Sequence, residues 1–286
     1  MTTASPPPDR YAVVGFPVAH SWSPFIHGMF AQNTGQHITY RLMEVPPQRF
    51  VAEVSAFFRA GGRGLNVTVP HKQAAAQLAK FRTARAEIAG AVNTLSDESG
   101  ELLGDNTDGA GLIADLQGNL QIKLADARIL LLGAGGAARG VIGPLLGCAP
   151  EVLLIANRDS SRAAQLAHEF SSLGNVRSGS FETVGKEKDP QPYDLILNAT
   201  SASLQNTVPP ISSKCIGNST ICYDMAYGHG STPFTRWALE KGAARAHTGW
   251  GMLLEQAAES FYLWRGIRPE TKPVMAAILA APKRSA

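Results

Sequence analysis

Apolar and polar residues alternate along the first third of the chain in segments of two kinds. Segments 11–16, 38–45 and 64–69 are short, apolar and rich in β-branched residues, which is typical of strands. Segments 24–33, 49–60 and 73–81 lie between or after them and have the length of helices. Strands that alternate with helices in this way predict parallel sheets with helical crossovers.

The middle of the chain repeats this rhythm. Segments 128–146 and 151–170 each read as a buried strand that leads into a helix, and strands follow at 193–200 and 220–225. A helix at 107–117 and a polar stretch at 118–127 separate the two series. Because 286 residues suffice for two cores, we expect an α/β protein of two domains, the second one doubly wound. The last helix, 249–266, is apolar on more than one face and should pack against the first domain.

Composition and charge narrow the possible partners. The chain is 44% hydrophobic and 17% charged, and its net charge of +3 comes from 26 basic and 23 acidic residues spread along it. This distribution argues against nucleic acid as a partner. No apolar run has the length of a membrane span, and the N-terminal residues do not resemble a signal peptide, so we expect a cytoplasmic protein. Either a monomer or a homodimer suits this composition.

The cysteines predict no metal site and no disulfide framework. Cys148, Cys215 and Cys222 are odd in number and lack the spacing of metal ligands. Each lies in or beside an apolar segment, so we expect buried free thiols.

A glycine-rich turn follows the strand at 128–132 and opens a helix. Gly133 allows the tight turn, Gly135 lets a pyrophosphate approach the backbone, and Ala138 is small enough for the helix to pack on the strand. Phosphates would lie at the helix N-terminus. A doubly wound domain without a nucleotide could carry the same turn, so the pattern indicates a dinucleotide site without deciding it.

The end of the next strand is where a dinucleotide site reads the adenosine ribose. NAD sites usually place an acidic residue there, whereas NADP sites place cations for the extra phosphate. The chain has Asn157, Arg158 and, one helical turn later, Arg162, which favours NADP. Asp159 would lie beside that phosphate, but Asp is also a preferred helix N-cap, and we favour the cap.

Three further segments carry polar residues that could form a site. In the segment GLNVTVPHK, Asn66 and Thr68 share the polar face of a strand that leads to Lys72. A half-buried strand with a surface lysine explains the same pattern. Asp105 and Asp108 of GDNTDGAG lie near the domain boundary, where Asp108 could equally be a plain helix N-terminal residue. Serines of the segment HSWSP could hold a carboxylate or serve only as cap and turn residues.

Taken together and in order, these segments resemble shikimate dehydrogenases of aromatic amino-acid biosynthesis. The resemblance extends from Tyr11 to Gly266, and its most specific features are the lysine after NVTVP and the aspartate that ends DNTD. The motifs are GFPVAHSWSPFIH, GLNVTVPHK, AGAVNTL, GDNTDGAG, LLGAGGAARG, NRDSSR, YDLILNATS, CYDMAYGHGSTPF and GWGMLLEQA. The resemblance implies reversible reduction of 3-dehydroshikimate to shikimate with NADPH. It also implies a substrate domain at 1–107 plus 245–286 and a Rossmann-type NADP domain at 108–244.

The resemblance assigns roles to the polar residues. Lys72 would donate the proton to the carbonyl oxygen, and Asp108 would hold that lysine and a ring hydroxyl. The residues implied in substrate binding are Ser21, Ser23, Asn66, Thr68, Asn93, Tyr227 and Gln256. Those implied in cofactor binding are Gly133, Ala134, Gly135, Gly136, Ala137, Asn157, Arg158, Arg162, Thr200, Met225 and Gly249.

Two departures from the family pattern leave alternatives open. Trp22 stands between the two serines where the family often has lysine, and Asp159 replaces a small hydroxyl residue after NR. Asp159 keeps open a quinate/shikimate dehydrogenase that uses NAD. A dinucleotide-binding regulator without catalysis is a further alternative, although such a protein has no need of Lys72 and Asp108.

Overall fold

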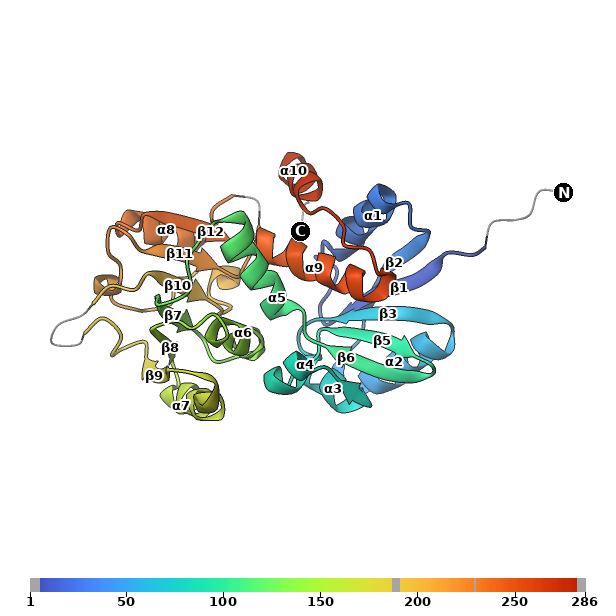
Figure 1. Ribbon diagram of the computed structural model, residues 1–286, viewed down its shortest axis with the longest axis horizontal. Helices are drawn as coiled ribbons and strands as arrows, with labels where there is room; N and C mark the ends of the chain where they lie inside the picture. Colours follow the sequence, from blue (N-terminus) through green and yellow to red (C-terminus); the bar gives the residue numbers. More distant parts are fainter. Residues whose placement is uncertain (1–5, 187–190, 229, 282–286) are drawn as a thin grey trace. The chain divides into compact units, whose positions relative to one another are not determined.

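The computed structural model describes residues 6–186, 191–228 and 230–281, which form two compact units (Figure 1). The first unit comprises Met1–Thr107 and Leu254–Ala286, and the second comprises Asp108–Leu253. We had expected residues 245–253 in the first domain. They belong to the second unit because β12 (Arg245–Thr248) pairs in parallel with β11 (Ile221–Asp224).

The strands described in the first unit form one six-stranded sheet in the order β2-β1-β3-β5-β6-β4. The strands are β1 (Asp9–Gly15), β2 (Ile38–Glu44), β3 (Gly62–Val67), β4 (Phe81–Arg82), β5 (Thr94–Glu98) and β6 (Glu101–Asp105). The expected parallel pairing holds for β1 with β2 and β3 and for β4 with β6, but it is wrong for β5, which is antiparallel to both β3 and β6. Ser99 and Gly100 join β5 to β6 with positive φ angles of 57° and 90°, and a two-residue turn of this kind connects only antiparallel strands.

Helices cover both faces of this sheet. Ala12 and Val14 of β1 pack with residues of α2 (Phe50–Arg59), α3 (Lys72–Leu78) and α4 (Ala84–Ala89). The alternate residue Tyr11 stacks on Trp264 of α9 (Trp250–Arg265), so α9 covers the other face. On that face α1 (Ser23–Thr34) runs along β2 (Figure 1), and α10 (Lys272–Ala280) contacts α1. A 3₁₀ turn, Pro47–Arg49, precedes α2.

The described strands of the second unit form a fully parallel sheet in the order β12-β11-β10-β7-β8-β9. This is the order of a doubly wound dinucleotide fold, with its switch point between β7 and β10. The remaining strands are β7 (Arg128–Leu132), β8 (Val152–Asn157), β9 (Val176–Ser180) and β10 (Leu195–Asn198). The expected α/β class with a Rossmann-type second unit is therefore confirmed.

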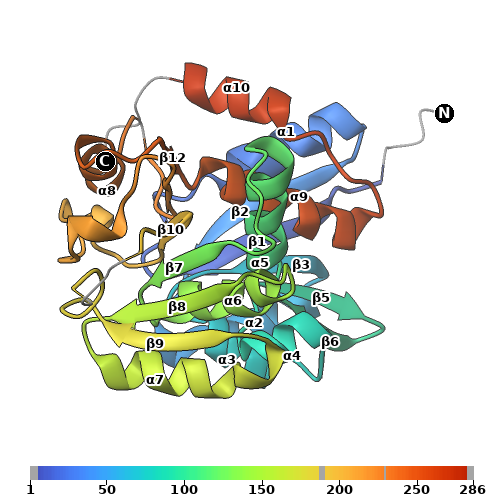
Figure 2. The same cartoon turned by 60° about the vertical axis from the view of Figure 1, so that its left-hand side comes forward.

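Successive apolar residues of β7 lie on opposite faces of the sheet, so they belong to two different hydrophobic cores. Ile129 and Leu131 pack with α6 (Gly136–Leu146), whereas Leu130 and Leu132 pack with α8 (Pro233–Glu240). Helix α7 (Ser160–Glu169) lies along β8 and β9 (Figure 2). The other helical segments are α5 (Asp108–Ile113), a π-helix at Ala114–Asn119 and 3₁₀ turns at Ser171–Leu173, Ser203–Gln205 and Ser213–Cys215.

The three cysteines are free thiols. Cys215 and Cys222 are buried, as expected, and burial raises the pKa of Cys222 to about 12. Cys148 is only half-buried, because it lies at the exposed end that follows α6. Among the helices of the described ranges, none is both long enough and apolar enough to cross a membrane.

A partly buried ion pair joins three elements of the first unit. Asp105 at the end of β6 is 4% exposed and accepts a forked pair of bonds from Arg85, at 2.6 and 2.8 Å. Arg85 also donates to Glu259 of α9 at 2.9 Å. Burial alone would raise the pKa of Asp105, but hydrogen bonds from Arg85 and Thr83 leave that pKa lowered. Asp105 therefore has a structural role.

We predict that Asp105→Asn lowers the free energy of unfolding at pH 7 by about 1–3 kcal/mol, because a charge-assisted pair is lost. A carboxyl whose pKa is lowered by folding stabilises the protein above its unfolded pKa, near 3.8, and stops doing so as the pH falls through the folded pKa. The difference between parent and variant in the free energy of unfolding, measured with urea, should therefore shrink as the pH falls below 3.8. Asp126→Asn, at an exposed Lys123 pair, is the control and should change nothing measurable. A difference that does not shrink at any pH below 3.8 would contradict this role for Asp105.

Helices α5 and α6 approach closely at a glycine. A Cβ on Gly109 would lie 2.2 Å from Pro144 Cγ and 2.9 Å from the carbonyl oxygen of Gly140. The backbone of α6 cannot yield without disturbing the core beneath it, which includes Ile142 and Leu145.

Gly109→Ala is therefore predicted to lower the free energy of unfolding by about 1–3 kcal/mol, the usual range for overpacking. Gly118→Ala serves as the control, since nothing lies within 4 Å of a Cβ at that position. Chemical denaturation of both variants measures the effect. Equal stability of the two variants would show that α5 can shift away from α6 at little cost.

Candidate active site

The amide of Asn66, in β3, is held by hydrogen bonds from several elements of the first unit. Its Nδ2 lies 3.0 Å from Ser260 Oγ, 3.2 Å from Thr94 Oγ1 and 3.3 Å from the carbonyl oxygen of Asn93. Its Oδ1 accepts a bond of 2.7 Å from the phenol of Tyr40. Asn66 is 7% exposed, so this amide is oriented almost entirely by protein groups.

A second buried amide, Asn93, continues the network. Its Oδ1 accepts the backbone N–H of Thr107 at 2.8 Å, and its Nδ2 donates to Thr107 Oγ1 at 2.9 Å and to Gln256 Oε1 at 3.3 Å. The structure thus brings together three predicted residues, Asn66, Asn93 and Gln256, that lie far apart in sequence. We define the polar network as Tyr40, Asn66, Asn93, Thr94, Thr107, Gln256 and Ser260.

Sequence reasoning missed four members of the polar network: Tyr40, Thr94, Thr107 and Ser260. Thr94 and Thr107 lie beside predicted residues in the segments VNTL and DNTD. Ser260 lies one helical turn after Gln256 and donates to its carbonyl oxygen at 3.0 Å. Helical spacing from Gln256 could have pointed to Ser260, whereas Tyr40 gave no local signal.

The two predicted serines lie together at the N-terminus of α1. Ser21 Oγ lies 3.1 Å from Ser23 Oγ and accepts the backbone N–H of Ser23 at 3.3 Å. Ser23 is the first residue of the helix. Trp22 between them is buried and packs edge-on against Phe25, so it serves the core of the unit. Hydroxyls at a helix start are a suitable binding place for a carboxylate.

The segment after β3 turns one side chain inward and the next one outward. His71 is 1% exposed, bonds the carbonyl oxygen of Val45 at 2.7 Å and stacks on Phe50. Lys72 follows as the half-buried first residue of α3. Thr68 packs across Gly15, where a Cβ would lie only 2.5 Å from the Thr68 methyl group. The histidine thus anchors the turn that presents Lys72.

Asp108 is the first residue of α5 and of the second unit, and it is 6% exposed. The other aspartate of GDNTDGAG, Asp105, is engaged by Arg85 as described above.

The glycine turn has the geometry expected for a phosphate site. Gly133 has φ 106°, a value that favours glycine, and donates its N–H to Ala156 at 2.7 Å. Gly135 precedes α6, which begins at Gly136, and a Cβ on either glycine would meet nothing within 4 Å. Ala134 and Ala137 complete this exposed turn. The open space above the helix N-terminus fits a pyrophosphate.

The residues at the end of β8 show that Asp159 acts as a helix cap. Asp159 caps α7, with its Oδ1 accepting the backbone N–H of Ser161 at 3.0 Å and the Ser161 hydroxyl at 2.6 Å. The hydroxyl bond is the main cause of its lowered pKa. Asn157 donates to the backbone carbonyl of Asp159 at 3.0 Å, while Arg158 and Arg162 are exposed. The preferred cap interpretation is therefore confirmed.

The segments after β10, β11 and β12 hold the residues predicted for the nicotinamide end. Thr200 donates to Asn198 Oδ1 at 2.7 Å, and Met225 begins the loop after β11. The N–H of Gly249 bonds Ala226 at 3.0 Å, and a Cβ on Gly249 would overlap the Met225 carbonyl oxygen at 2.3 Å. Gly249 therefore allows a close backbone approach that no other residue permits.

Tyr227, predicted to contact the substrate, lies in the second unit. Its ring packs on Trp250 with centroids 4.8 Å apart. The other residues predicted to bind substrate, from Ser21 to Gln256, lie in the first unit.

A buried carboxylate that sequence reasoning did not single out anchors the loops after β10 and β11. Asp224 is fully buried, and its oxygens accept bonds from Asn198 at 3.0 Å, Ser203 at 2.5 Å and Thr232 at 2.6 Å. Burial raises the pKa of Asp224 against the opposing effect of these bonds. Its position at the end of CYD was the only sequence signal.

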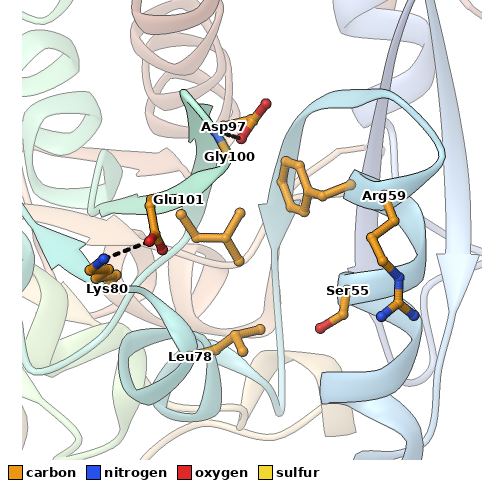
Figure 3. A pocket seen from close by; sticks show the side chains of 9 residues that line it. Ser55, Arg59, Leu78, Lys80, Asp97, Gly100 and Glu101 are labelled. Carbon is orange, nitrogen blue, oxygen red and sulfur yellow. Dashed lines mark hydrogen bonds and ion pairs between the residues drawn. The ribbon is translucent and has the colours of Figure 1, made fainter.

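One open hollow of the first unit contains no residue of the predicted site (Figure 3). Its charged groups are mostly satisfied within the protein, since Lys80 pairs with Glu101 at 2.5 Å and Asp97 accepts the N–H of Gly100 at 3.0 Å. The hollow has a volume of about 370 Å³ and is lined by Ser55, Phe58, Arg59, Leu78, Lys80, Asp97, Gly100, Glu101 and Leu102.

Comparisons with known proteins agree with this architecture. Residues 13–95 match the shikimate dehydrogenase substrate binding domain, 115–207 match shikimate / quinate 5-dehydrogenase, and 249–279 match the shikimate 5'-dehydrogenase C-terminal domain. Shikimate dehydrogenase (NADP(+)) of Nitrosospira multiformis is 52% identical over 93% of this chain and 96% of its own. The enzyme of the same name from Methylococcus capsulatus is 50% identical over 98% and 99% of the two chains.

Solved structures show the same fold. Shikimate 5-dehydrogenase of Thermus thermophilus, in complex with NADP(H) and shikimate, is 32% identical, with a TM-score of 0.84 over 94% of this chain and 98% of its own. Shikimate dehydrogenase of Aquifex aeolicus is 29% identical, with a TM-score of 0.85 over 97% and 99% of the two chains. Similarity over almost the whole length, at about half identity, places this chain in the shikimate dehydrogenase family.

Proposed function

We propose that this protein catalyses the reversible, NADP-dependent reduction of 3-dehydroshikimate to shikimate in aromatic amino-acid biosynthesis. The observation that carries the proposal is the presence in one chain of Lys72, the polar network and a glycine turn followed by two exposed arginines. Relatives of about half identity are named shikimate dehydrogenase (NADP(+)), which supports both the substrate and the cofactor.

Substrate binding is assigned to hydroxyl and amide groups. Ser21 and Ser23, at the positive end of α1, bind the substrate carboxylate. Asn66, Asn93 and Gln256 of the polar network hold the ring hydroxyls. Thr68 and Tyr227 add further polar contacts. Because the network amides are held by the protein before substrate arrives, little ordering is needed on binding.

Proton transfer is assigned to Lys72. NADPH supplies a hydride to the carbonyl carbon when it is bound. The Lys72 ammonium donates a proton to the carbonyl oxygen and stabilises the negative charge that develops there. Asp108 accepts a hydrogen bond from a ring hydroxyl of the substrate. In the oxidative direction the lysine accepts the proton instead.

Cofactor binding is assigned to the second unit. The backbone N–H groups at the start of α6 hold the pyrophosphate in the open space beside Gly135 and Gly136. Arg158 and Arg162 bind the 2′-phosphate of the adenosine ribose. Asn157, Thr200, Met225 and Gly249 line the ribose and nicotinamide ends.

The alternatives are not favoured. Asp159 was the feature that kept an NAD-using quinate/shikimate dehydrogenase open, and its carboxylate is engaged in capping α7. A regulator without catalysis would not need Lys72. The composition supports a cytoplasmic enzyme that acts as a monomer or a homodimer and does not bind nucleic acid.

We predict that Lys72→Ala lowers kcat for shikimate oxidation by about 10²- to 10⁴-fold while the KM for shikimate changes much less. The reason is that the proton is needed in the transition state and less in the ground state. Steady-state assays with shikimate and NADP⁺ measure the effect.

Lys80→Ala is the matched control, since Lys80 pairs with Glu101 on the surface of the same unit. It should keep kcat within about twofold of the parent. A Lys72→Ala enzyme that retained turnover within a few fold of the parent would remove the proton-transfer role, while an inactive parent would overturn the proposed function itself.

The cofactor assignment predicts that Arg158→Ala lowers the preference for NADP⁺ over NAD⁺ by about 10- to 100-fold, because a charge-assisted contact to the 2′-phosphate is lost. The ratio of kcat/KM for the two cofactors is the quantity to measure.

Asp159→Ser tests the helix cap in the same assay. Serine also caps helices, and the Asp159 carboxylate is turned toward Ser161, so the cofactor ratio should stay within about threefold of the parent. A tenfold gain in NADP⁺ preference would show instead that the carboxylate faces the phosphate. A parent that works better with NAD⁺ would overturn the cofactor assignment.

A further inference from the structure

The side chain of Tyr40 extends across the sheet of the first unit to Asn66, a residue proposed to bind the substrate. It lies on β2, which pairs with β1, while its hydrogen-bond partner Asn66 lies on β3 at the other side of β1. The phenol donates to Asn66 Oδ1 at 2.7 Å. The proposed proton and hydride transfers do not involve Tyr40.

The phenol is a neutral donor under ordinary conditions. Burial raises the pKa of Tyr40 well above its usual value, against the smaller opposing effect of the Ser23 hydroxyl. The Tyr40 hydroxyl therefore keeps its proton and can donate it to Asn66 on β3.

The carbonyl oxygen of Asn93 decides which way the Asn66 amide points. It lies 3.3 Å from Asn66 Nδ2 and can only accept, so the flipped amide would set two oxygens against each other there. In the orientation that Asn93 selects, Asn66 Oδ1 faces Tyr40 and the phenol donates to it at 2.7 Å.

Aromatic packing holds the phenol ring itself in place. The ring stacks on His27 with centroids 4.3 Å apart and an interplanar angle of 6°, and Trp264 lies 6.5 Å away. Burial lowers the pKa of His27 to about 3, so this ring is uncharged near neutral pH. The phenol oxygen therefore has little freedom to leave Asn66.

We infer that Tyr40 is a positioning residue for substrate recognition, whose phenol helps to hold the Asn66 amide in place. The inference rests on the proposed function, because it requires that Asn66 binds the substrate. It predicts that loss of the phenol oxygen weakens substrate binding without altering proton transfer or cofactor binding.

The test is Tyr40→Phe, which keeps the ring stack on His27 and removes only the oxygen that bonds Asn66. The KM for shikimate should rise by roughly 5- to 30-fold, because Asn66 Oδ1 is left without its donor and that side of the amide is no longer held. The kcat and the KM for NADP⁺ should each stay within about threefold of the parent. A purely structural role would lower the melting temperature without this selective change in the shikimate KM.

Tyr11→Phe is the matched control, because Tyr11 is a buried tyrosine of the neighbouring strand whose oxygen accepts from Arg265 at 3.2 Å, away from Asn66. It should leave the KM for shikimate within about twofold. A double-mutant cycle adds a second criterion: in an Asn66→Ala background, Tyr40→Phe should change that KM by less than about twofold, since its route of action is gone.

The measurements distinguish a failure of the proposed function from a failure of the role of Tyr40. A parent without shikimate oxidation would overturn the proposed function. An active parent in which Tyr40→Phe leaves the shikimate KM unchanged, or changes it as strongly in the Asn66→Ala background, would overturn only the role of Tyr40.

Discussion

Both units depend on hydrogen bonds within the protein to stabilise polar groups that have been taken out of water. In the first unit these groups are the amides of Asn66 and Asn93, and in the second unit the carboxylate of Asp224. Each of them lies at or next to one end of a strand and is satisfied by side chains from other elements. The positions of several loops and helices follow from these bonds.

The same hydrogen bonds also hold the loops that carry predicted binding residues. Binding residues at strand ends are usually presented by loops, which are mobile unless something ties them down. Asp224 ties the loops after β10 and β11 through Asn198, Ser203 and Thr232, so Thr200 and Met225 sit on supported backbone. In the first unit α9 provides the same support through Ser260 and Gln256. Support of this kind lowers the ordering cost of binding a ligand.

The positions of the tight glycine turn, the close helix–strand packing and the helix cap were predictable from the sequence. Gly133 was expected at a tight turn, and its φ of 106° agrees. Ala138 was expected to lie between helix and strand, and it is fully buried in that core. The cap by Asp159 was also predicted from its place before SSRAAQLA, because capping depends on only a few neighbouring residues. Features that depend on residues within one helical turn or one strand end can be recognised in the sequence.

The sequence by itself determined the α/β class, the doubly wound second unit, the glycine turn and the residues that the family pattern marks. Only the tertiary structure decided that Asp105 is an ion-pair partner of Arg85, that β5 and β6 run antiparallel, and that residues 245–253 belong to the second unit. It also revealed the bond from Ser260 to Asn66, which joins residues 194 positions apart, and the phenol of Tyr40 beside it. The spacing of hydrophobic residues and the conformation of a turn depend on neighbouring residues, so they can be recognised in the sequence. The hydrogen-bond partner of a buried polar group is brought to it only by folding and can lie anywhere in the chain.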